Sequence, residues 1–451
     1  MTMPTMAHQS PKSLVKSTAC PLRPGEITDY DPLLELIGDA RFVLLGEASH
    51  GTHEFYRERA QITKRLIHEK GFSAVAVEAD FPDAQRVNRY VRGRSDDLEA
   101  IDSLGGFQRF PAWMWRNADV LDFVGWLRAH NDDQPDDFSK TGFYGLDLYS
   151  MNSSMNAVVD YLDKVDPGAA RRARQRYACF DHFGGDSQRY GLETTIGRSL
   201  SCEKEVVSQL VELYARASEL ARLDGRMAAD EFFNAGQNAR LVRNAEQYYR
   251  TMYSDDISSW NLRDHHMMET LIELNHHLTH KHQPPKIVIW EHNSHLGDAR
   301  ATAMGERGEW NVGQLVREHF AGETALVGFT TYHGTVTASS DWGGKAERKR
   351  VRPALDGSIE SLFHETEIER FLLPLREAGR LKNALRAPRL ERAIGVIYRP
   401  ETERQSHYFH ARLADQFDAV IHIDETRAVE PLERTSLWDT GELPETYPSG
   451  L

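Results

Sequence analysis

Seven short and almost continuous apolar runs constrain the fold of this chain more than any other feature of its sequence. They are RFVLLG (41–46), SAVAVEAD (73–80), TGFYGLD (141–147), KIVIWEH (286–292), TALVGFTTY (324–332), AIGVIY (393–398) and DAVIHID (418–424). Parallel strands that are covered on both faces have this composition, whereas half-exposed strands alternate apolar and polar residues. Between the first two runs, Phe55, Ile62 and Leu66 have helical spacing and Gly71 marks a helix end. The sequence therefore predicts an α/β fold with a mainly parallel sheet flanked by helices.

Residues 155–283 interrupt this alternation. They hold no strand-like run, and the segments 203–223, 229–253 and 257–282 have the composition of helices. A run of helices that interrupts alternating strands and helices is most simply an insertion, and we expect it to pack as a cap over the carboxyl ends of the strands. The domain organisation that we expect is a flexible N-terminal tail (1–21), the first part of the α/β core (22–154), the helical cap (155–283) and the second part of the core (284–451).

Charge and composition exclude several classes of protein. The formal net charge of -14 argues against a nucleic-acid partner, which requires a basic surface. The basic stretch KAERKRVR (345–352) is expected to be a solvated loop, with a clamp for an anionic group as the alternative. No apolar run approaches the roughly 20 residues that span a bilayer, and residues 1–20 lack the apolar core of a signal peptide. We expect a cytoplasmic protein with no membrane partner.

The cysteine pattern supports the same compartment. Cys20, Cys179 and Cys202 are the three cysteines, and none forms a CxxC pair. Neither a disulfide framework nor a thiolate zinc site is indicated, so a reducing cytoplasm fits best. No feature of the sequence indicates an oligomeric state.

Carboxylate and imidazole side chains gather directly behind the predicted strands. They are Glu47, His50 and His53 after the first run, Glu78, Asp80 and Asp83 at the end of the second, Asp147 at the end of the third, Glu291, His292, His295 and Asp298 after the fourth, and His333 after the fifth. Because the carboxyl ends of parallel strands meet at one edge of a sheet, we expect these side chains to line one cleft. His53 and Glu54 belong instead to the first turn of the helix that follows. Arg263 and His266, at the start of the last cap helix, are further residues that could face the cleft.

These residue types are suited to the activation of water. The chain has no GxSxG elbow, no GxGxxG or Walker loop, and no cysteine with a histidine partner nearby in sequence. A histidine can take a proton from water while a neighbouring carboxylate orients its ring and stabilises the imidazolium. The prediction is hydrolysis by a directly attacking water without a cofactor. The alternative is a metal-dependent hydrolase, because Glu47, His50, Glu78, His292 and His295 also suit zinc or another divalent ion.

Several longer blocks resemble the erythromycin esterase family. They are LLGEASHGTHEFYRERA, VAVEADFPDAQRVNRYVRG, FQRFPAWMWRN, GFYGLDLYS, WNLRDHHM, IWEHNSHLGDAR and GFTTYHGTVTASSDWGGKAERKRVRPAL. They occur in the expected order from about residue 25 to 440, and the cap and ERKRVR segments are closer to the broad branch of homologues than to the macrolide-inactivating members. The resemblance implies a hydrolase that opens an ester or macrocyclic lactone of a small-molecule substrate.

The resemblance also implies roles for particular residues. His50 would be the general base with Glu47 as its partner, and Glu78 would be a second essential carboxylate. His292 and His295 would be further active-site residues. Arg59 would either polarise the ester carbonyl or hold a carboxylate. Distant likeness to proteins that cleave peptides with a metal or bind haem leaves two alternatives, a metal-dependent hydrolase and a binding protein for a haem-like small molecule.

Overall fold

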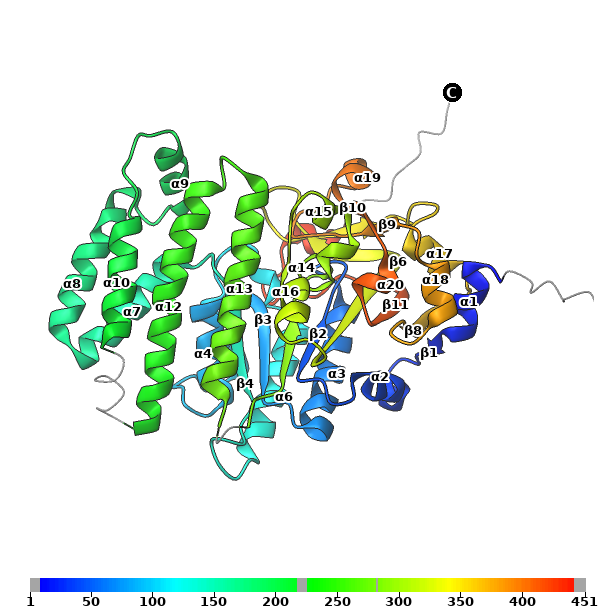
Figure 1. Ribbon diagram of the computed structural model, residues 1–451, viewed down its shortest axis with the longest axis horizontal. Helices are drawn as coiled ribbons and strands as arrows, with labels where there is room; N and C mark the ends of the chain where they lie inside the picture. The colour runs from blue at the N-terminus through cyan, green and yellow to red at the C-terminus, as the bar shows by residue number, and fades with distance from the viewer. Residues whose placement is uncertain (1–8, 217–224, 281–282, 442–451) are drawn as a thin grey trace, which may run out of the picture.

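A mixed nine-stranded sheet organises the computed structural model, which describes residues 9–216, 225–280 and 283–441 (Figure 1). Its strands are β1 (Cys20–Pro21), β2 (Phe42–Leu45), β3 (Ala74–Asp80), β4 (Gly142–Asp147), β5 (Ile287–Trp290), β6 (Thr324–Ala338), β7 (Glu347–Val351), β8 (Arg370–Pro374) and β11 (Ala419–Thr426). Their order is β1-β8-β11-β6-β2-β5-β3-β4, and β7 pairs with β6 outside this path. The six strands from β11 to β4 are all parallel. The predicted α/β class with a mainly parallel sheet is confirmed.

Three antiparallel strands were not expected from the sequence. They are β1 and β8 at one edge and β7, which pairs with the second half of β6. The prediction of a strand at 393–398 is wrong. These residues lie against loops and form only isolated bridges, such as the parallel bridge between Ser49 and Ile394. The preceding residues form β9 (Arg389–Arg392), which makes a separate hairpin with β10 (Tyr408–Ala411).

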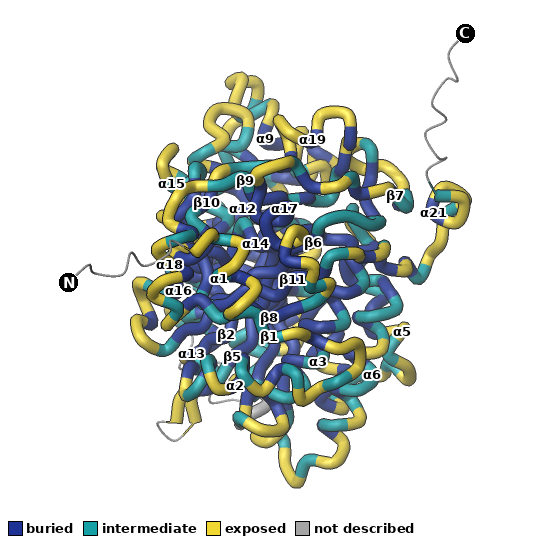
Figure 2. The backbone as a smooth tube through the Cα atoms, turned by 90° about the vertical axis from the view of Figure 1, so that its right-hand side faces the viewer, coloured by how far each residue is buried: buried dark blue, intermediate teal, exposed yellow. Residues whose placement is uncertain are grey.

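Helices cover both faces of the sheet. Helix α3 (His53–Lys70) buries Phe55, Ile62 and Leu66 against one face and ends at Gly71, whose left-handed φ of 69° suits glycine. His53 and Glu54 are its first two residues, as predicted. Helix α13 (Asp256–Leu278) packs Met267 and other apolar side chains against the opposite face, together with α16 (Val312–His319). Buried backbone is concentrated at the sheet, and the exposed backbone lies in peripheral turns (Figure 2).

Five further helices lie beside β4, at the edge of the sheet, and have a core of their own (Figure 1). They are α7 (Met151–Val165), α8 (Pro167–Tyr177), α9 (Ser187–Thr195), α10 (Glu203–Ala215) and α12 (Gly225–Thr251). Helix α6 (Ala118–Asp132) instead packs against the sheet core. Residues 217–223 of the helix predicted at 203–223, and residues 281–282 of the helix predicted at 257–282, lie outside the described residues. So do residues 1–8 of the predicted tail and residues 442–451 of the core.

Three local predictions are wrong. The predicted flexible tail includes α1 (Pro11–Thr18), whose Val15 is fully buried, and β1, which pairs with β8. Cys179 and Cys202 form a disulfide within the helical region, although they are far apart in sequence and have no motif spacing. The KAERKRVR segment is mostly strand β7 instead of a loop, because Lys349 is buried and donates to Ser340 Oγ at 2.7 Å.

Among the helices described, none combines the length and the apolar composition that would be required to cross a membrane.

Candidate active site

The loop after β2 holds a buried pair of Glu47 and His50. The carboxylate Oε1 of Glu47 lies 2.9 Å from His50 Nδ1, and its Oε2 accepts a 2.7 Å hydrogen bond from Arg59 Nη2. Gly46 permits the turn before this pair, since a Cβ there would lie 2.1 Å from Asn293 Oδ1. The backbone of His50 is fixed by a hydrogen bond to Ile394 O, so the 393–398 segment holds this loop although it is not a strand.

Opposing effects set the pKa of the His50 imidazole. Burial alone would lower it, but the negative charges of Glu78 and of the hydrogen-bonded Glu47 outweigh burial, and the pKa of His50 is raised. Arg263 acts in the opposite direction and is the smallest contribution. The pair is therefore arranged to stabilise an imidazolium.

Arg263 of α13 joins the carboxylates at the ends of β3 and β4. Its guanidinium donates to both oxygens of Asp147, at 3.0 and 2.8 Å, and to Glu78 Oε1 at 2.7 Å. Glu78 Oε2 also accepts the backbone N–H of His292 at 2.9 Å. Burial would raise the pKa of Glu78, but its electrostatic interactions with His295, His50 and Arg263 and the hydrogen bond from the His292 backbone hold it well below its usual range. Glu78 is a carboxylate at working pH.

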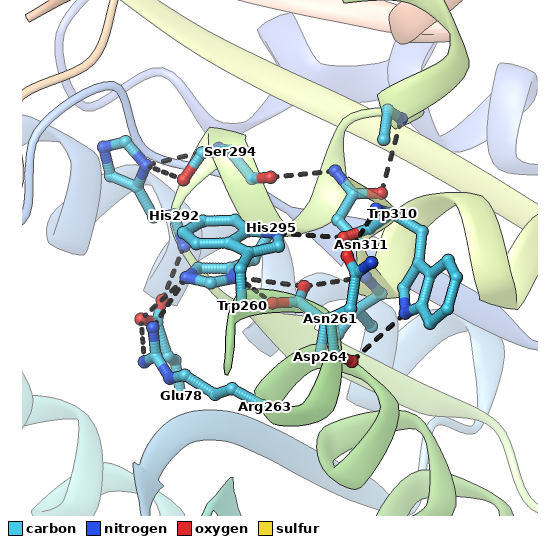
Figure 3. A network of polar contacts seen from close by, with 12 residues as sticks. Glu78, Trp260, Asn261, Arg263, Asp264, His292, Ser294, His295, Trp310 and Asn311 are labelled. Atoms are coloured by element: carbon cyan, nitrogen blue, oxygen red, sulfur yellow. Dashed lines mark hydrogen bonds and ion pairs between the residues drawn. The ribbon is translucent and has the colours of Figure 1, made fainter. Parts of the chain in front are cut away.

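The loop after β5 presents two histidines in different environments (Figure 3). His295 Nδ1 lies 3.0 Å from both oxygens of Asp264, its Nε2 lies 2.9 Å from Arg263 Nη1, and its ring stacks on Trp260 at 4.4 Å. The His292 ring lies 4.8 Å from the His50 ring. Burial and the neighbouring His50 hold the pKa of His292 well below its usual value, so this ring is neutral.

The proton of the neutral His292 ring can be placed from its contacts. Its Nδ1 accepts the backbone N–H of Ser294 at 3.2 Å, so the proton is on Nε2. His292 Nε2 is buried and has no hydrogen-bond partner among the described residues. It is thus a donor without a hydrogen-bond acceptor in that part of the chain, although the backbone carbonyl of Ala48 interacts with the ring and acts to raise its pKa.

A cavity of about 370 Å³ lies at the ends of these strands. The polar lining includes His50, Glu78, Asp147, Arg263, His292 and His295, and the apolar lining includes Phe107, Met114, Trp115 and Phe409. Glu47 and Arg59 are not in the lining and lie behind His50. The order of the strands explains why these side chains lie together. Strands β2, β5, β3 and β4 are consecutive neighbours in the sheet, and polar residues follow each of them at the same edge.

The structure brings together Glu47, His50, Arg59, Glu78, His292 and His295, and it adds Trp260 and Asp264 of α13, which were not singled out from the sequence. Of the other predicted strand-end residues, Glu291, Asp298 and His333 do not line this cavity, and His333 lies within β6 at a different one. Of the two cap residues considered, Arg263 lines the cavity, whereas His266 is buried against Asn244 and burial lowers its pKa to about 4. The signal for Trp260 and Asp264 was present in the WNLRDHHM block.

The candidate metal ligands do not form a metal site. Within residues 9–216, 225–280 and 283–441, no three His, Cys, Asp or Glu side chains are grouped to hold an ion. Glu47 is paired with Arg59, Glu78 is paired with Arg263, and His295 is paired with Asp264.

Fold and site together define an α/β protein whose parallel strands deliver a histidine–carboxylate pair to a cavity at their carboxyl ends. The model of the erythromycin esterase family matches residues 67–426. The chain belongs to the erythromycin esterase family, and this membership supports a hydrolase of the esterase type.

Individual relatives are distant but extend over most of the chain. Erythromycin esterase type II of Escherichia coli is 23% identical over 351 residues, which is 74% of this chain and 80% of that protein. The crystal structure of a succinoglycan biosynthesis protein matches with a TM-score of 0.74 and 21% identity, over 95% of this chain and 100% of the other. An erythromycin esterase mutant in its open conformation matches with a TM-score of 0.66 and 15% identity, over 91% and 96% of the two chains. At these identities the solved structures establish the fold alone.

Proposed function

We propose that this protein hydrolyses a carboxylic ester or a macrocyclic lactone by direct attack of water, with His50 as the general base. The observation that carries the proposal is the His50–Glu47 hydrogen bond of 2.9 Å at the wall of the cavity. His50 Nε2 makes no hydrogen bond to any described residue and is the atom that would take the proton of water. The negative charges of Glu47 and Glu78 stabilise the imidazolium that forms.

Arg59 has a supporting role in this proposal. Its guanidinium binds Glu47 and lies over the rings of Tyr56 and Trp290, at 4.6 and 5.3 Å from their centroids. These contacts favour the role of holding a carboxylate over the role of polarising the ester carbonyl. Arg59 thus fixes the orientation of Glu47, which in turn fixes the His50 ring.

His292 is the donor that we assign to the developing oxyanion. Its neutral ring carries the proton on Nε2, faces the same cavity and stands beside the His50 ring. A preorganised donor of this kind stabilises a tetrahedral intermediate by about 3 to 4 kcal/mol in an enclosed site. His295, held by Asp264 and Trp260, keeps Arg263 and Glu78 in place.

The substrate class follows from the family and the cavity. An ester or lactone carbonyl has no charge and suits a cavity with apolar walls and a few polar groups. The volume of about 370 Å³ accommodates the ester and its immediate neighbours. The name of the Escherichia coli relative makes macrolide lactones the first compounds to test.

A panel of aryl esters, alkyl esters, simple lactones and macrolide lactones tests the proposal. We expect turnover of at least one class, with one oxygen from labelled water in the product acid. His50→Gln should abolish it, whereas His53→Gln should retain it, because His53 pairs with Asp119 outside the cavity. Equal turnover by His50→Gln would refute the proposal. A ligand that binds but is recovered unchanged would instead favour the small-molecule binding protein.

A further inference from the structure

A second cavity of about 510 Å³ adjoins the active-site cavity. The two share Asp80, Arg109, Tyr149 and Trp342 as lining residues. The second cavity lies between the strand ends and the helical region, because its other walls include residues 185–188 and Tyr248, Tyr249 and Met252. A ligand larger than the active-site cavity can therefore extend into this space.

The shared wall is a rigid cluster of paired charges. Arg109 donates to both oxygens of Asp80, at 2.8 and 3.1 Å. The guanidinium groups of Arg109 and Arg263 lie 4.8 and 4.9 Å from the Tyr149 ring centroid. Because Asp80 and Arg109 offset each other, this wall contributes little net charge to the second cavity.

The other charged lining residues of the second cavity are acids. They are Asp83 in the first turn of α4 (Phe81–Val91) and Asp186, which caps α9. Asp83 makes no hydrogen bond or ion pair in the part of the chain that the structure describes. Burial and the nearby Asp80 raise the pKa of Asp83 to about 7, although Arg109 and Arg86 oppose this. The cavity thus contains a carboxyl group without a cationic partner.

The second cavity also contains an unpaired hydroxyl group and an aromatic wall. Ser150 is 8% exposed, and its hydroxyl has no hydrogen-bond partner among the described residues. The aromatic wall consists of Tyr248, Tyr249, Phe110 and Trp342, and the last two have ring centroids 5.1 Å apart. Aromatic rings around an unpaired carboxylate are the usual surroundings of a bound ammonium group.

We propose that the second cavity binds a cationic, amine-bearing group of the substrate whose ester lies against His50, with Asp83 as its counter-ion. This inference rests on the proposed function for the position of the ester, but not for the binding of the cation. An anionic group is disfavoured because the single lining arginine is already paired with Asp80. The site would therefore select esters that carry an amine remote from the carbonyl.

Direct binding tests the cation site without any turnover. Tetraethylammonium should bind the wild-type protein in calorimetry, and Asp83→Asn should weaken this binding about tenfold or more. Asp133→Asn removes the same charge from an exposed residue outside the cavity, and it should bind as the wild type does. No binding to the wild type, or equal binding by Asp83→Asn, would overturn the proposal.

Turnover tests the link between the two cavities. Each pair of test esters consists of a cationic ester with a terminal quaternary nitrogen and a neutral ester with carbon in the same position. The ratio of their kcat/KM values is measured for a series of chain lengths between this terminal group and the ester. We expect the wild type to prefer the cationic ester about tenfold at one length, and Asp83→Asn to lose this preference. Turnover without a preference at any length would overturn the proposal. Cation binding that depends on Asp83, with no ester hydrolysed, would support the cation site and refute the esterase instead.

Discussion

Replacing Glu47 by Gln tests whether the charge of this residue, and not only its hydrogen bond, supports catalysis. The amide can still accept from His50 Nδ1–H, but it no longer stabilises the imidazolium. At the 2.9 Å separation and an effective dielectric constant of about 20, the Coulomb energy is at most about 6 kcal/mol. Because Arg59 already binds the same carboxylate and Glu78 remains, we expect a net loss of about 2 to 4 kcal/mol. This corresponds to a fall in kcat of about 30- to 1,000-fold.

The assay is kcat/KM for the best ester of the panel between pH 5 and 9. Since Glu47 raises the pKa of His50, the variant should also lose activity only at lower pH than the wild type does. Glu54→Gln is the matched control, because Glu54 is a buried carboxylate of the next helix that binds the backbone N–H of Arg427 and does not line the cavity. It should retain both kcat and the pH profile.

Folding must be separated from catalysis in this experiment. The Glu47→Gln substitution leaves the buried guanidinium of Arg59 without its counter-ion, which costs about 3 to 5 kcal/mol of unfolding free energy. The double variant Glu47→Gln/Arg59→Met removes both charges and should recover much of this stability without recovering kcat. A folded double variant with kcat within about threefold of the wild type, and an unmoved pH profile, would refute the reasoning.

Three further changes have defined outcomes. Glu78→Gln removes the largest contribution that raises the pKa of His50, so the fall of kcat/KM at acidic pH should occur at a lower pH than in the wild type. An unchanged pH profile of kcat/KM would show that the charge of Glu78 does not influence His50. His292→Phe removes the Nε2 donor and should lower kcat about 100-fold or more with a smaller change in KM, measured on the same ester; a change in KM alone would contradict the oxyanion role. Gly51→Ala places a Cβ 1.8 Å from Thr337 O, so urea unfolding should show a loss of about 1 to 3 kcal/mol, whereas an unchanged midpoint would contradict this packing.

The parallel part of the sheet could be predicted because its strands carry their own signal. Runs such as SAVAVEAD are apolar on both faces, and the structure places them between two layers of helices. The short strands β1 and β7 lack this signal, whereas β8 has an apolar run, residues 371–373, that was not recognised as a strand from the sequence. In β7, Lys349 is buried by its neighbours within a run of charged residues, and only the tertiary partner β6 makes the segment a strand.

The candidate site divides in the same way. Glu47, His50, Glu78, His292 and His295 follow or end strands, so the rule for strand ends was sufficient to bring them together. No such rule places the residues of α13 at the site, because tertiary packing determines which face of a helix lies against the cavity. The second cavity could not be predicted either, since its walls combine strand ends with helices that are far apart in sequence.

The cysteine pair shows a related limit. Cys179 and Cys202 are 23 residues apart and have no recognisable spacing. Their pairing depends on the packing of the short helical turn at 178–183 next to the start of α10, which the sequence does not encode in any local pattern.

In the proposed reaction, the neutral His50 imidazole takes the proton of the attacking water. The most direct test of this step compares the pKa of the His50 ring, measured by NMR titration with His50→Gln for assignment, with the pKa in the kcat/KM profile of the free enzyme. We expect one shared value, raised above the 6.5 of an ordinary histidine, with activity lost as the pH falls through it. A profile that titrates at a different pH from His50, or that does not change while His50 becomes protonated, would contradict this role of His50.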